Sequence, residues 1–129
     1  NTHVVLGESM LGERTNLSLE RLHTIRDYPN AIYLKAFDCS VQAGGYNSFH
    51  EMRSVRIPTL FIPNTNTGMD DQTKRATHSV AEGCGLVAQP NKKDIITGIE
   101  KLLNLEKVSS TENQVNGATE TAKFILSQT

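Results

Sequence analysis

The residues best suited to chemistry lie in one short segment, residues 44–51, which reads Gly-Gly-Tyr-Asn-Ser-Phe-His-Glu. Two glycines follow a predicted strand that ends at Gln42, and a helix is predicted directly after them. Glycine lets the backbone approach a ligand closely. A helix start offers free N–H groups and the positive end of the helix dipole. Together these features are typical of a site for a phosphate or diphosphate.

The same segment also has a purely structural interpretation. Asn47 and Ser48 are good N-cap residues, and Ser48 with Glu51 has the spacing of a capping box. Two consecutive glycines are also a common turn signal. Local features alone therefore leave both interpretations open, an anion site and a helix cap.

A second polar loop, residues 63–72, lies between a predicted buried strand and a predicted helix. Asp70 or Asp71 could cap that helix. The carboxylate and amide of Asp71 and Gln72 also suit sugar hydroxyls, which both donate and accept hydrogen bonds. We expect no metal here, because two adjacent carboxylates without a third ligand do not make a metal site. The loop after Ala88 carries little information.

Several elements in order resemble a known signature. They are residues 44–51, then Ile57-Pro58, Ile62-Pro63 and Asp71-Gln72. This series is similar to the donor-binding signature of GT-B glycosyltransferases. It resembles both the C-terminal domain of the bacterial peptidoglycan N-acetylglucosaminyl transferases and the nucleotide-sugar box of plant glucosyltransferases. The clear match spans residues 33 to about 103, and the agreement of these elements in order and spacing is more specific than any one of them.

The resemblance implies a role for each matching residue. The implied site consists of the diphosphate-binding residues Gly44, Gly45, Asn47 and Ser48, the ribose-binding acid Glu51, and the sugar-binding pair Asp71 and Gln72. One departure matters, because Ala43 stands where the plant box has a phosphate-binding histidine. The backbone must therefore supply more of the diphosphate contact.

The elements that must position these loops are short strands alternating with helices. We expect strands at residues 3–6, 23–28, 38–42, 59–62 and 86–88, and helices at residues 16–22, 30–37, 48–55, 71–82 and 94–103. This alternation predicts an α/β fold, a Rossmann-like parallel sheet with helices on both faces. Ligands bind such sheets at the carboxyl ends of the strands, here after Gln42, Pro63 and Ala88.

Apolar spacing also predicts which helix residues are buried. The helix at 30–37, capped by Asn30, is expected to bury Ile32, Ala36 and Phe37. The helix at 94–103 carries one stripe of five apolar residues, Ile95, Ile96, Ile99, Leu102 and Leu103. Residues 109–121 are polar and predict a linker. A last helix would place Ala118, Ala122 and Ile125 on one side, with Phe124 adjacent. We therefore expect a partial nucleotide-sugar-binding domain at 1–108 and a linker with a C-terminal helix at 109–129.

Composition excludes several classes of protein. The 129 residues, 37% hydrophobic and 21% charged, predict one globular domain. The net charge of −1, with no basic stripe, argues against a nucleic-acid partner. No apolar run is long enough to span a membrane. Cys39 and Cys84 indicate buried, reduced thiols and a cytoplasmic location. Four scattered histidines do not predict a zinc site, and no cofactor is expected.

The resemblance implies that the chain is most of the donor-binding domain of a GT-B glycosyltransferase that uses a nucleoside diphosphate sugar, a UDP-sugar. The chain begins within a predicted strand, so we expect a fragment of a longer protein. The resemblance then implies that the missing parts are an N-terminal acceptor domain with the catalytic base, and the opening strand and helix of this domain. It would then be inactive alone and would self-associate through an unpaired sheet edge. Two alternatives remain open, a non-catalytic donor-binding subunit and a sugar-nucleotide 2-epimerase of the same architecture.

Overall fold

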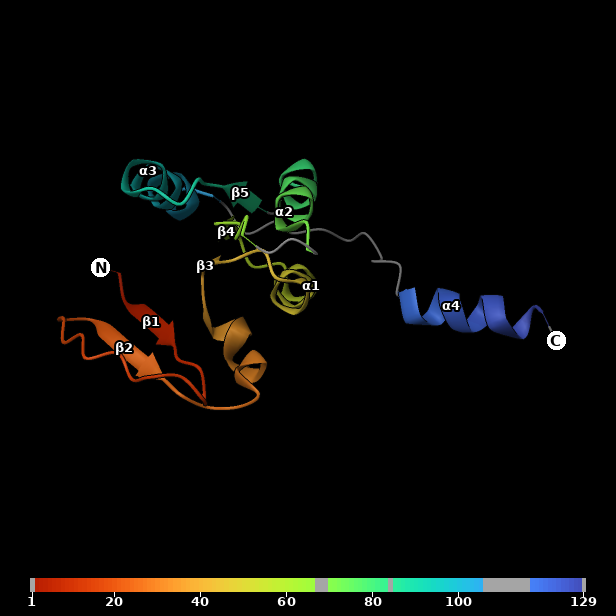
Figure 1. Cartoon of the computed structure of the whole chain (residues 1–129), viewed down its shortest axis with the longest axis horizontal. Helices are drawn as coiled ribbons and strands as arrows, with labels where there is room; N and C mark the ends of the chain where they lie inside the picture. Colours follow the sequence, from red (N-terminus) through yellow and green to blue (C-terminus); the bar gives the residue numbers. More distant parts are fainter. Residues whose placement is uncertain (1, 67–69, 84, 106–116, 129) are drawn as a thin grey trace.

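The computed structural model describes residues 2–66, 70–83, 85–105 and 117–128 (Figure 1). The strands are β1 (Val4–Gly7), β2 (Leu22–Ile25), β3 (Ser40–Gln42), β4 (Thr59–Phe61) and β5 (Gly85–Val87). The helices are the 3-10 helix η1 (Asn30–Ala36) and the α-helices α1 (Tyr46–Val55), α2 (Gln72–Ala81), α3 (Lys92–Leu103) and α4 (Gly117–Leu126). Strands and helices alternate from β3 to α3, as the sequence predicts.

Strands β3, β4 and β5 form a parallel sheet in chain order, with β4 in the centre. Val41 pairs with Leu60, and Leu60 pairs with Leu86. Because all three strands run the same way, their carboxyl ends lie at one edge of the sheet. The loops after Gln42, Phe61 and Val87 therefore leave from that same edge, which confirms the predicted arrangement.

Helices cover both faces of this sheet (Figure 1). Successive side chains of a strand point to opposite faces, so Leu60 and Phe61 of β4 enter different clusters. Phe61 packs with Phe49 of α1 and Ala76 of α2. Leu60 packs on the other face with Ala88 and Leu102 of α3. The predicted α/β fold with helices on both faces is confirmed for this sheet.

The close contact between α3 and β4 depends on Gly98. A Cβ atom at this position would lie 2.8 Å from both Cδ atoms of Leu60, which is fully buried. The missing side chain therefore lets α3 approach the centre of the sheet. The buried stripe of α3 is narrower than predicted: Gly98 and Leu102 are buried and Ile95 and Ile99 half-buried, whereas Ile96 and Leu103 are exposed.

The predicted single sheet is wrong for the part of the chain that the structure describes. There β1 pairs in parallel with β2 alone, as a separate two-stranded sheet, with Val5 opposite His23. The His3 Nδ1 and His23 Nε2 atoms lie 3.0 Å apart beside this pairing. Strand assignment depends on local pattern, whereas joining β1 to β3 would need edge-to-edge hydrogen bonds that local pattern does not encode.

Two predicted helices in the first third of the chain differ from the structure. Residues 16–21 form no helix, and β2 begins at Leu22. A helix this short is unstable in water without an apolar face to bury, and Leu19 is 66% exposed. The helix at 30–37 is the 3-10 helix η1, preceded by Pro29 as its N-cap residue. Its predicted buried face is absent, and Ile32 is 66% exposed.

The C-terminal helix α4 begins earlier than the predicted linker would end. Residues 117–121, assigned to the linker, form its first turns, while 109–116 lie outside the described residues. An ion pair of 2.8 Å between Glu120 and Lys123, three residues apart, supports the helix. All of α4 is exposed, Phe124 included. No helix in the described ranges has the length and apolar character needed to cross a bilayer.

The packing of β4 generates a prediction on stability. Replacing the fully buried Leu60 by Ala should lower the free energy of unfolding by about 2–5 kcal/mol, because it removes apolar contacts and leaves a cavity. The matched control is Leu103→Ala on α3, where the leucine is 53% exposed. That variant should change stability by less than about 1 kcal/mol in the same urea titration. Equal losses for the two variants would contradict the assigned core.

Candidate functional site

The glycine pair leads directly into α1. Gly45 is the N-cap residue, with φ −58° and ψ 150°, and it makes no side-chain cap. The first intrahelical bond, 2.9 Å, runs from the Phe49 N–H to the Gly45 carbonyl. The N–H groups of Tyr46, Asn47 and Ser48 precede that bond, and none of the residues that the structure describes accepts from them. They form an open set of donors at the positive end of the helix.

The capping-box interpretation of this segment is wrong. The helix begins at Tyr46, so Asn47 and Ser48 lie inside its first turn instead of capping it. Glycine at the N-cap position replaces the side-chain cap that the sequence suggested. The carboxylate of Glu51 is exposed and makes no hydrogen bond or ion pair with the described residues. The start of α1 therefore does not need Glu51.

The structure brings the two predicted loops together at Gly44. A Cβ atom added there would lie 3.0 Å from the Gln72 carbonyl oxygen and 3.4 Å from the Gln72 Cβ. Only glycine fits this approach without displacing the start of α2. Gln72 itself is 8% exposed, and its Oε1 accepts a 3.0 Å hydrogen bond from the Asn64 N–H. The carbonyl of this amide thus supports the loop after β4.

Asp71 caps α2, as one of the two interpretations of this loop predicted. Its Oδ1 accepts a 2.9 Å hydrogen bond from the Lys74 N–H. The residue is exposed and stands directly before Gln72 at the start of the helix. Capping uses one carboxylate oxygen in the described structure, so Asp71 also presents a polar group beside the Gly44 loop.

Arg75 is a residue of this site that the sequence analysis missed. Its Nε donates a 3.1 Å hydrogen bond to the Gly44 carbonyl, and its guanidinium forms an ion pair with Asp70. Its Cζ also lies 5.9 Å from the centre of the Tyr46 ring. Arg75 follows Gln72 by three residues, which places both on one face of α2. That spacing is the sequence signal that could have found it.

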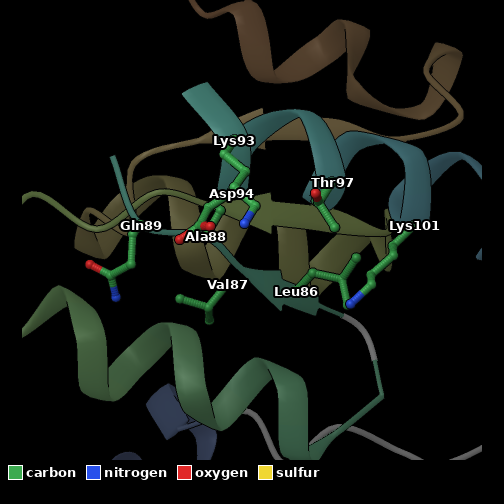
Figure 2. A pocket seen from close by; sticks show the side chains of 9 residues that line it. Leu86, Val87, Ala88, Gln89, Lys93, Asp94, Thr97 and Lys101 are labelled. Atoms are coloured by element: carbon green, nitrogen blue, oxygen red, sulfur yellow. The ribbon is translucent and has the colours of Figure 1, made fainter. Parts of the chain in front are cut away.

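A separate cavity of about 360 Å³ lies between β5 and α3 (Figure 2). Residues 86–89 line one side, and Lys93, Asp94, Thr97 and Lys101 of α3 line the other. It contains none of the predicted site residues. The described residues also contain no group of three or more histidine, cysteine, aspartate or glutamate side chains that could hold a metal ion. Cys39 forms no disulfide with a described residue and is half-buried instead of buried as predicted, and Cys84 lies outside the described residues.

Comparison with known proteins supports the fold. No family model and no curated protein matches the chain. A solved structure named spinosyn forosaminyltransferase SpnP is similar, with a TM-score of 0.62 and 20% sequence identity. The similarity covers 78% of this chain but only 26% of that one, so the chain spans about a quarter of its structural relative. The predicted fold class is thereby confirmed: an α/β architecture similar to that of a GT-B glycosyltransferase.

The contact between Gly44 and Gln72 generates a prediction with a matched control. Gly44→Ala should destabilise the chain by about 1–3 kcal/mol, because the added methyl group must displace backbone. Gly45→Ala should change stability by about 0.5 kcal/mol or less, because no atom lies within 4 Å of its Cβ position. Thermal and urea unfolding of both variants measure the difference. A Gly44→Ala variant as stable as Gly45→Ala would show that the two loops are not in close contact.

Proposed function

We propose that this chain is the donor-binding part of a glycosyltransferase and that it binds a UDP-sugar at the carboxyl ends of β3 and β4. The observation that carries the proposal is the open set of N–H groups at Tyr46, Asn47 and Ser48, directly after Gly44 and Gly45. The fold similarity to a forosaminyltransferase supports a role in sugar transfer. The acceptor and the catalytic base would come from a second domain.

The diphosphate of the donor would lie against the start of α1. Its oxygens would accept hydrogen bonds from the backbone N–H groups of Tyr46, Asn47 and Ser48, and Gly45 would allow close approach. Negative charge grows on this leaving group as the glycosidic bond breaks. A fixed helix start therefore stabilises the transition state more than the ground state. This account requires no metal.

The ribose would bind one turn farther along the helix. Asn47 and Glu51 are four residues apart, so they lie on the same face of α1. A nucleoside attached to a diphosphate at the first turn can thus reach the Glu51 carboxylate. A carboxylate accepts hydrogen bonds from two ribose hydroxyls. Because Glu51 has no structural partner in the described chain, its charge remains available for this contact.

The transferred sugar would lie next to the start of α2. Asp71 caps the helix through one oxygen, and the other can accept a hydrogen bond from a sugar hydroxyl. Gln72 uses its carbonyl oxygen to hold Asn64, so it would contribute its amide nitrogen. The sugar contact therefore depends more on Asp71 than on Gln72, and removing Gln72 would disturb the loop as well as the ligand.

The ribose contact can be tested at Glu51. Glu51→Ala should weaken UDP binding by about 1–3 kcal/mol, because the ribose hydroxyls lose a charged acceptor. Stability should not change, since the carboxylate has no partner in the described chain. Isothermal titration calorimetry measures the affinity for UDP, and thermal unfolding measures the stability of the variant. The control variant is Glu100→Ala. Glu100 is an exposed residue of α3, which covers the opposite face of the sheet, so this variant should bind UDP with the affinity of the wild-type chain. Unchanged affinity in Glu51→Ala would refute the ribose contact.

The sugar contact can be tested at Asp71 without loss of the helix cap. Asp71→Asn should keep α2 intact, because asparagine caps helices as well as aspartate does. It should weaken binding of UDP-glucose or UDP-N-acetylglucosamine by about 0.5–1.5 kcal/mol and leave free UDP unaffected. The free nucleotide is the internal control. Equal losses for UDP and the sugar nucleotides would place Asp71 away from the sugar.

A further inference from the structure

Arg75 connects the two halves of the candidate site. It arises from the second turn of α2 and reaches the Gly44 carbonyl, which precedes the first turn of α1. Its guanidinium also lies by the ring of Tyr46, the first residue of α1. The side chain is 20% exposed. A fixed cation therefore lies beside the helix start that would hold the diphosphate.

The guanidinium of Arg75 has more N–H donors than its contacts in the described chain use. An arginine side chain carries five N–H donors in a fixed planar arrangement. In the described chain, Nε donates to Gly44 and Nη2 pairs with Asp70, and no other acceptor contacts the group. The Asp70 side chain is about one-third exposed, so this partly buried ion pair can be reached from solvent. An oxyanion with more negative charge can therefore replace the carboxylate as the partner of the guanidinium.

We propose that Arg75 binds the donor diphosphate and that Asp70 holds its guanidinium until the nucleotide arrives. This inference rests on the proposed function and names the side chain that would contact the charged diphosphate. A diphosphate carries more negative charge than one carboxylate and can accept two parallel N–H bonds from a guanidinium. The exchange supplies the side-chain contact that Ala43 cannot make. It also makes Asp70 a competitor of the ligand, which a purely structural ion pair would not be.

A matched ion pair provides the control. Arg53 of α1 binds Glu82, beyond the end of α2, through Nε at 2.9 Å. It joins the far ends of the same two helices whose starts are joined by Arg75. Replacing either arginine by glutamine removes an ion pair between the same elements. Only Arg75→Gln removes a cation from the candidate site.

The experiment is isothermal titration calorimetry of the full chain, first with UDP and then with uridine, which lacks phosphate. Arg75→Gln should raise the dissociation constant of UDP about tenfold or more and change that of uridine by less than about twofold. Arg75→Lys, which keeps the charge but loses the planar arrangement, should show a smaller loss. Asp70→Asn should bind UDP about threefold or more tightly than the wild-type chain. Arg53→Gln should match the wild-type chain for both ligands.

Three results would overturn the proposal. Arg75→Gln could leave the affinity for UDP unchanged, or lower the affinities for UDP and uridine equally. Either result would mean that Arg75 joins the two loops but does not bind the diphosphate. Weaker UDP binding in Asp70→Asn would do the same. If circular dichroism shows that Arg75→Gln does not fold, the UDP affinities of Arg75→Lys and Asp70→Asn decide whether Arg75 binds the diphosphate. A wild-type chain that binds neither UDP nor uridine would overturn the proposed function itself, and this inference with it.

Discussion

The close approach of Gly44 to the start of α2 is the contact on which the candidate site depends. Parallel strands carry the loops after β3 and β4 to one edge of the sheet, but they do not by themselves bring those loops into contact. A residue without a side chain at position 44 lets the backbone of one loop pack on Gln72 of the other. This contact brings the start of α2, with Asp71 and Arg75, next to the start of α1, where we propose that the ligand binds.

The spacing of α1 and α2 is fixed at both ends and in the middle. Arg75 bonds Gly44 and Asp70 near the helix starts, and Arg53 bonds Glu82 at the far ends. Between them, Phe49, Phe61 and Ala76 form a buried cluster against β4. The apolar cluster supplies most of the stabilisation, because exposed ion pairs contribute little. The polar contacts at the helix starts therefore contribute less to the stability of the fold than this cluster does.

Much of this arrangement can be predicted from sequence because the signals are local and strong. The apolar run between Pro58 and Pro63 predicts β4, and the apolar stripe of residues 95–103 predicts α3, although not its N-cap at Asn91. The parallel-sheet rule then places residues 44 and 72 at one edge. What escaped prediction depends on tertiary contact. The N-cap at Gly45 leaves no side-chain signal, Arg75 acquires its role only by packing, and the separation of β1 and β2 from β3 depends on non-local pairing.

The central claim is that the start of α1 binds the donor diphosphate, and amide chemical shifts test it most directly. In a titration of the isotope-labelled chain with UDP, the amide signals of Tyr46, Asn47 and Ser48 should move most, because their N–H groups would donate to phosphate. The start of α3, where the Asp94 N–H already donates to the Asn91 side chain, is a second helix start in the same molecule and should remain unchanged. Shifts at both helix starts, or at α3 alone, would contradict the account.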